Sequence, residues 1–93
     1  MVRYYIVKGR VQGVGFRWLV HREAGLRGLK GWVRNTEGGE VEVMVAGSLE
    51  QLAELRAVLE RGSRGSRVDA VQERDMDESM AEGLESFQIE GAW

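Results

Sequence analysis

Three glycines stand close to an arginine early in the chain, within the run Gly9-Arg10-Val11-Gln12-Gly13-Val14-Gly15-Phe16-Arg17. Glycine allows neighbouring backbone N–H groups to converge, and the N-terminus of a following helix favours an anion at the same place. Arg17 can hold two oxygens of that anion with its planar guanidinium group. The pattern therefore indicates a phosphate or carboxylate site. The alternative is a tight strand-to-helix turn with an exposed arginine.

A neutral amide, Asn35, lies near the end of a second run, Gly31-Trp32-Val33-Arg34-Asn35-Thr36, just before a glycine-rich turn. An amide can orient a water molecule by hydrogen bonding, and it does so without requiring a particular pH. Asparagine before a turn is also ordinary turn chemistry. Position alone therefore leaves both interpretations of Asn35 open.

Other groups that could do chemistry are scarce. The chain has no cysteine, which excludes disulfides, thiolate metal sites and a cysteine nucleophile. His21 is the only histidine, and its place on the expected helix predicts that it faces solvent. The acidic group Asp75, Asp77 and Glu78 lacks the spacing of a calcium loop. We therefore expect no metal, no cofactor and no covalent intermediate.

The remaining groups limit the chemistry. An anion cradle, an arginine and an amide suffice only for a phosphate compound whose leaving group departs without being protonated. Acyl phosphates meet this condition, because the acid of the leaving carboxylate has a pKa of about 4 and needs no general acid. The protein then has to position water and stabilise charge on the transferring phosphoryl group.

The length and composition describe a small soluble protein. The 93 residues predict one domain over residues 1–93, and 43% hydrophobic with 30% charged residues is typical of a globular chain. A net charge of −2 gives no general attraction to nucleic acid. The sequence begins without the apolar run of a signal peptide and contains no membrane span. We expect a cytoplasmic protein that is most simply a monomer.

Apolar periodicity and turn residues predict seven regular elements. Strands are expected at residues 2–8, 29–36, 41–45, 68–74 and 84–90. The first helix is expected from Phe16 to Gly28, with the apolar stripe Phe16, Leu19, Val20 and Ala24. The second helix begins at a capping box, Ser48-Leu49-Glu50-Gln51, and ends at Gly62. Its apolar stripe is expected to consist of Leu49, Leu52, Leu55 and Leu59. Loops are expected at residues 37–39, 62–67 and 75–83.

This order of elements indicates an α+β fold. A βαββαβ sandwich with an extra short C-terminal strand places two helices on one face of an antiparallel sheet. That fold hosts enzymes, ligand sensors and RNA-binding modules alike, so it does not decide the function. The aromatic side chains are interpreted as core or rim residues rather than base-stacking platforms; they are Tyr4, Tyr5, Trp18, Trp32 and Trp93.

The segments Gly9–Arg17 and Gly31–Asn35 together resemble the two signature segments of the acylphosphatase family, and the similarity extends over essentially the whole chain. The resemblance implies a ferredoxin-like sandwich and hydrolysis of acyl phosphates. It also implies that Arg17 binds the phosphate, that Asn35 orients the attacking water, and that the substrate's own phosphate accepts the proton of that water. The implied phosphate cradle is formed by the backbone of Gly9, Arg10, Val11, Gln12, Gly13, Val14 and Gly15.

Three residues outside these segments qualify the expectation. Thr36 matches a residue that can support the amide of Asn35, or it is simply a β-branched strand residue. Gly38 stands where the family commonly has aspartate, and Gly62 is followed by Ser63 rather than by proline, which leaves the order of the 62–67 loop open. A phosphate or carbamoyl-phosphate sensor and an RNA-binding sheet are the competing functions.

Overall fold

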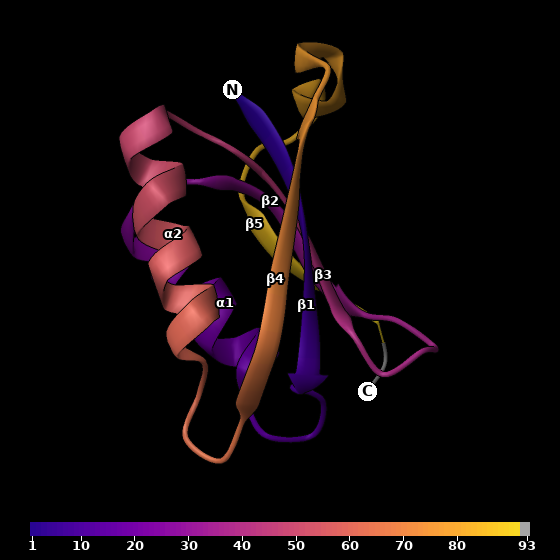
Figure 1. Ribbon diagram of the computed structural model, residues 1–93. Coiled ribbons are helices and arrows are strands. Elements are labelled where there is room, and N and C mark those ends of the chain that lie inside the picture. Colours follow the sequence, from indigo (N-terminus) through magenta and orange to yellow (C-terminus); the bar gives the residue numbers. More distant parts are fainter. Residues whose placement is uncertain (92–93) are drawn as a thin grey trace.

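A five-stranded sheet with both helices packed against one of its faces forms the framework of the protein (Figure 1). This computed structural model describes residues 1–91. The strands are β1 Val2–Arg10, β2 Lys30–Asn35, β3 Val41–Ala46, β4 Arg67–Met76 and β5 Phe87–Glu90, and the helices are α1 Phe16–Leu26 and α2 Leu49–Arg61. Between β4 and β5 lies a short 3₁₀ helix, η1 Glu78–Ala81.

The strand order is β4-β1-β3-β2-β5. The first four strands pair antiparallel, whereas β5 runs parallel to β2. The predicted ferredoxin-like βαββαβ arrangement with an extra C-terminal strand is therefore confirmed. The complete sheet is mixed rather than antiparallel throughout, because a strand that follows β4 and η1 returns to the opposite edge in the direction of β2.

Alternate residues of the central strands form the core beneath the helices. Tyr5 and Val7 of β1 are fully buried, as are the three valines of β3. The predicted stripes of both helices supply the other half of the core: Phe16, Val20 and Ala24 from α1, and Leu52, Leu55 and Leu59 from α2. Leu49, expected in the stripe of α2, is exposed because it occupies the first helical position, and Val58 is buried with the stripe.

The helix ends follow the sequence signals. The Gln51 N–H donates to Ser48 Oγ at 3.1 Å, and the Ser48 N–H donates to Gln51 Oε1 at 2.8 Å, which is the expected capping box. At the end of α1, the Gly28 and Leu29 N–H groups donate back to the Gly25 and Ala24 carbonyls. The last helical residue is Leu26, so the helix ends slightly before the predicted Gly28.

Three strand boundaries differ from the prediction by more than one residue. β1 continues past Gly9 to Arg10 with an irregularity between Lys8 and Gly9, and a Cβ at Gly9 would lie 2.1 Å from the Arg67 carbonyl oxygen. This close approach to β4 explains why glycine occurs inside the strand. β4 likewise extends to Met76. β5 begins only at Phe87, because the Leu84 N–H closes a turn with the Ala81 carbonyl.

The aromatic residues and His21 are placed less uniformly than expected. Tyr5 is buried, whereas Trp18 is 69% exposed, and Trp93 lies outside the described residues. His21 was predicted to face solvent, which is wrong in part: it is half-buried, and its ring centroid lies 6.4 Å from that of Phe87. The cause is β5, which lies beside α1 and covers this side of the helix. None of the helices within residues 1–91 combines the length and the apolar composition needed to cross a membrane.

Candidate active site

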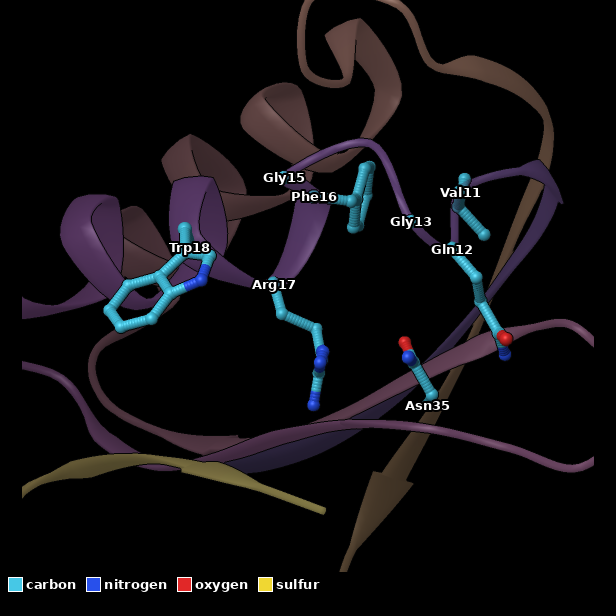
Figure 2. Close-up of a pocket in the computed structure, with 8 residues that line it drawn as sticks. All are labelled: Val11, Gln12, Gly13, Gly15, Phe16, Arg17, Trp18 and Asn35. Carbon is cyan, nitrogen blue, oxygen red and sulfur yellow. The ribbon is translucent and has the colours of Figure 1, made fainter. Parts of the chain in front are cut away.

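A cavity of about 480 Å³ lies where the β1–α1 loop, the first turn of α1 and the end of β2 meet (Figure 2). The two segments that the sequence singled out, about twenty residues apart, therefore face each other across one space. The described residues that line it are Val11, Gln12, Gly13, Gly15, Phe16, Arg17, Trp18 and Asn35.

The loop over this cavity depends on backbone conformations that glycine adopts easily. Gly13 and Gly15 have φ angles of 74° and 75°, in the left-handed region that side chains disfavour. No atom lies within 4 Å of the place where a Cβ would stand at either position, so conformation rather than space requires glycine. Val11 and Phe16, each 1% exposed, anchor the loop in the core. The loop is thus fixed at both ends and tightly turned between them.

The N-terminus of α1 opens into the same cavity. Gly15 is the N-cap residue, and the first helical hydrogen bond is donated by the Leu19 N–H to the Gly15 carbonyl at 3.1 Å. The N–H groups of the preceding turn have no acceptor inside the helix. Within the described chain, no capping side chain accepts from them and no acidic residue occupies the first turn. The positive end of the helix dipole therefore lies uncompensated at the cavity.

Arg17 extends from the first turn of α1 toward the strands (Figure 2). Its Nη1 donates a hydrogen bond to the Glu90 carbonyl oxygen of β5 at 3.1 Å. Because this acceptor is a backbone group, it orients the guanidinium group without neutralising its charge. The importance of β5 for Arg17 was not predicted, since no sequence pattern indicates which carbonyl a side chain 73 residues away will meet.

Asn35 is the last residue of β2, where it pairs with Val41 of β3. Its amide points from the strand toward the β1–α1 loop, and its Oδ1 atom is buried (Figure 2). The amide and the guanidinium group of Arg17 thus approach the cavity from two different elements. Asn35 ends a strand whose position is set by hydrogen bonds on both sides, to β3 and to β5.

Gln12 connects the loop to the β2–β3 hairpin. Its Nε2 donates to the Thr36 and Glu40 carbonyl oxygens, each at 2.8 Å. From the other side, Ser63 Oγ donates to the Val14 carbonyl at 2.9 Å. Sequence reasoning assigned only a backbone role to Gln12 and none to Ser63. A polar residue inside a glycine-rich loop was a usable signal for Gln12, whereas nothing in the sequence distinguished Ser63.

Several predicted residues lie outside this cavity. Gly9 and Arg10 belong to β1, where they pair with Val68 and Arg67 of β4. Val14 lines a neighbouring cavity instead. The Thr36 hydroxyl accepts a hydrogen bond from the Glu40 N–H at 3.2 Å, which makes it a residue of the hairpin turn. Their predicted roles in phosphate binding and in supporting the Asn35 amide stay predictions.

A hydrogen-bonded cluster holds β1, β2 and β3 together on the face of the sheet away from the helices. Tyr4 Oη and Arg34 Nε both donate to the Glu42 carboxylate, and the Arg34 guanidinium group lies 4.3 Å from the centre of the Trp32 ring. Burial raises the pKa of Tyr4 to about 12, and the bond to Glu42 adds to the rise. Partial burial of Glu42 by itself raises the pKa of its carboxyl group, but the two hydrogen bonds outweigh this effect and the pKa is lowered.

The chemistry available in the cavity is narrow. Among the described residues that line it, Arg17 supplies a positive charge and Gln12 and Asn35 supply amides, while aspartate, glutamate, histidine, lysine and tyrosine are absent. The cavity can bind an anion and orient a neutral molecule such as water. Its described lining offers no side chain that titrates near neutral pH and could act as a general acid or base.

The fold and the cavity define a class of protein: a small ferredoxin-like domain with an anion-compatible cavity at the N-terminus of its first helix. Within that class, the family model described as Acylphosphatase matches residues 3–89. The chain belongs to the acylphosphatase family, and it is therefore an enzyme that hydrolyses acyl phosphates, which are small molecules.

Individual relatives agree with this assignment. The acylphosphatase of Koribacter versatilis (strain Ellin345) is 50% identical over 91 residues, covering 98% of this chain and 81% of that protein. The crystal structure of acylphosphatase from Bacillus subtilis is 39% identical, with a TM-score of 0.83 over 98% of this chain and 100% of the other. An acylphosphatase structure from Coxiella burnetii is 29% identical, with a TM-score of 0.87 over 96% and 90% of the two chains.

Proposed function

We propose that the phosphoryl group of an acyl phosphate binds in the cavity beside Arg17, with its oxygens held by the guanidinium group and by backbone N–H groups of residues 11–17. A water molecule held by the Asn35 amide attacks phosphorus directly. Three features support this arrangement: the uncompensated N-terminus of α1, the guanidinium group oriented by β5, and an amide directed at the same space.

The observation that carries the proposal is the absence of acidic, basic and phenolic groups other than Arg17 from the described lining of the cavity. A phosphate monoester would require an acid to protonate its alkoxide leaving group. An acyl phosphate releases a carboxylate that is stable at neutral pH, so protein positioning and charge stabilisation suffice. The proton of the attacking water passes to the phosphate of the substrate, in keeping with the family resemblance, and no metal or cofactor takes part.

The test is the hydrolysis of benzoyl phosphate, followed by its loss of absorbance in the presence of a chelator. We expect saturable turnover by the unmodified protein, and a loss of about 100-fold or more in Arg17→Ala and in Asn35→Ala. Arg74→Ala, which removes an exposed arginine of β4 outside the cavity lining, serves as the matched control and should retain turnover. Full activity in either of the first two variants would refute the role assigned to that residue, and a requirement for metal would refute the metal-free route.

A further inference from the structure

A second cavity, of about 570 Å³, adjoins the first. The two cavities share Gly15 and Trp18, so one bound molecule can occupy both. The second cavity lies between α1 and the loop that follows α2, and it is not used by the chemistry described above. Any group attached to a phosphate in the first cavity and directed along α1 enters this space.

The second cavity is strongly basic on one side. Arg22, Arg61 and Arg64 line it, and its described lining includes neither aspartate nor glutamate. Arg22 Nε is already paired with Glu23 at 3.3 Å. Within residues 1–91, by contrast, no ion pair or side-chain hydrogen bond involves Arg61 or Arg64. Two guanidinium groups therefore lie at one place without a carboxylate partner among the described residues, although the whole chain carries a net charge of −2.

The loop that follows α2, which carries Arg64, is hydrogen-bonded to the β1–α1 loop of the first cavity. Ser63 Oγ donates to the Val14 carbonyl at 2.9 Å, and Ser66 Oγ donates to the Ser63 carbonyl at 2.7 Å. The loop is thus closed on itself and bound to the β1–α1 loop, which sets its distance from a phosphate bound there. Trp18, mostly exposed, forms the boundary between the two cavities, and its indole ring offers an apolar surface to a carbon chain or ring.

We propose that the second cavity is the acyl-group subsite, and that it selects acyl phosphates whose acyl group carries a second oxyanion, either carboxylate or phosphate. Trp18 contacts the carbon skeleton, and Arg61 and Arg64 hold the distal oxyanion. This inference rests on the proposed function, because it takes the first cavity as the phosphoryl site. It adds a substrate class: doubly anionic acyl phosphates are bound more tightly than singly anionic ones of the same shape.

The test uses phosphonates that cannot be hydrolysed, so binding is measured apart from turnover. 4-Carboxybenzylphosphonate and 4-phosphonobenzylphosphonate carry a distal oxyanion, and 4-carbamoylbenzylphosphonate is their neutral counterpart. Calorimetry on the unmodified protein should show about fivefold tighter binding of at least one charged probe, the size expected for an exposed charge pair. The ratio of the two affinities should fall toward one as the ionic strength rises from about 0.02 M to about 0.5 M, because salt screens exposed charges.

Two double variants with equal net charge separate a local site from a general field. Arg61→Gln/Arg64→Gln should abolish the preference for the charged probes, whereas Lys30→Gln/Arg74→Gln, which removes two positive charges elsewhere, should retain it. Circular dichroism and thermal unfolding check that each variant is folded.

An unmodified protein that binds charged and neutral probes equally would overturn the subsite, and so would equal loss of the preference in both double variants. Failure of the proposed function is recognised separately: benzoyl phosphate would then not be hydrolysed, whatever the preference among the phosphonates. Absence of binding by all three phosphonates would contradict both the phosphoryl site and the subsite.

Discussion

Gly15 and Gly25 differ in backbone conformation. Gly15 is the N-cap residue of α1 and Gly25 lies inside the helix. Gly15 has a φ of 75°, whereas Gly25 is an exposed helical residue without positive φ, and at neither position would an added Cβ have an atom within 4 Å. Alanine at the two positions therefore tests backbone conformation without steric overlap.

We expect Gly25→Ala to stabilise the protein by about 0.5–1 kcal/mol, because alanine restricts the unfolded chain and suits a helix. Gly15→Ala should instead destabilise it by about 1 kcal/mol or more, because alanine disfavours the left-handed region. Urea unfolding monitored by tryptophan fluorescence measures both changes. A gain in stability from Gly15→Ala would show that the loop does not need the left-handed conformation.

At the residue scale, the candidate site residues could be selected from the sequence, but the contacts that orient them could not. Arg17 and Asn35 could be selected because glycine spacing and a strand end give them recognisable surroundings. The support of Arg17 by the Glu90 carbonyl could not, since every residue has a carbonyl and only the folded chain decides which one lies 3.1 Å away. The 69% exposure of Trp18 was not predicted either, although Trp18 lies outside the apolar stripe of α1 and its neighbours one turn further on, His21 and Arg22, are polar.

The link between the β1–α1 loop and the β2–β3 hairpin belongs to the scale of elements. The Gln12 side chain donates to two carbonyls of that hairpin, so Gln12→Ala removes both bonds while leaving each element intact. We expect a stability loss of about 1–2 kcal/mol and a rise in KM for benzoyl phosphate, because the loop is no longer held at a fixed distance from Asn35. Steady-state kinetics and urea unfolding provide the two readouts.

Gln72→Ala is the matched control, because Gln72 is an exposed residue of β4 that does not line the cavity. It should change neither KM nor stability noticeably. An unchanged KM in Gln12→Ala would mean that the glycine-rich loop holds its conformation without the hairpin.

The cluster formed by Tyr4, Arg34 and Glu42 predicts how sheet stability depends on pH. The pKa of Glu42 is lower in the folded protein than its ordinary value of 4.5. The contribution of Glu42 to the free energy of unfolding is therefore fully present above the pKa that its carboxyl group has in the unfolded chain. It is lost as the pH falls through the lower pKa of the folded protein.

Accordingly, Glu42→Gln should lower the free energy of unfolding by about 1 kcal/mol at pH 7. The difference in stability between this variant and the unmodified protein should shrink as the pH falls below 4.5. Urea unfolding over a series of pH values measures this difference, with the exposed Glu85→Gln as control. A difference that stays constant down to about pH 3, below the ordinary carboxyl pKa, would show that the effect comes from packing rather than from charge.

Elements whose bounds are set by neighbouring residues were predicted better than elements whose bounds or direction depend on distant parts of the chain. The capping box set the start of α2 correctly, and valine alternation located β3. The parallel pairing of β5 with β2 depends on a sheet edge formed some fifty residues earlier in the chain. No local pattern in residues 84–90 carries that information, so this strand was predicted without its direction.

For the molecule as a whole, the topology explains why the site exists at all. The order β4-β1-β3-β2-β5 places the β1–α1 loop, the end of β2 and the last strand at one end of the sheet. Residues near positions 15, 35 and 90 thereby meet, and the fold class could be predicted because it follows from the order of elements alone. The single domain, the monomeric state and the cytoplasmic location stay predictions from the sequence.

The central claim is that binding of the phosphoryl group and placement of water are divided between two residues. The most direct measurement pairs calorimetry of inorganic phosphate binding with kcat for benzoyl phosphate in Arg17→Ala and Asn35→Ala. In Asn35→Ala we predict that kcat falls about 100-fold or more while the Kd for phosphate changes less than about threefold, because only the water is misplaced. In Arg17→Ala the Kd itself should rise strongly. Equal loss of phosphate binding in both variants, or an unchanged kcat in Asn35→Ala, would contradict the division of roles.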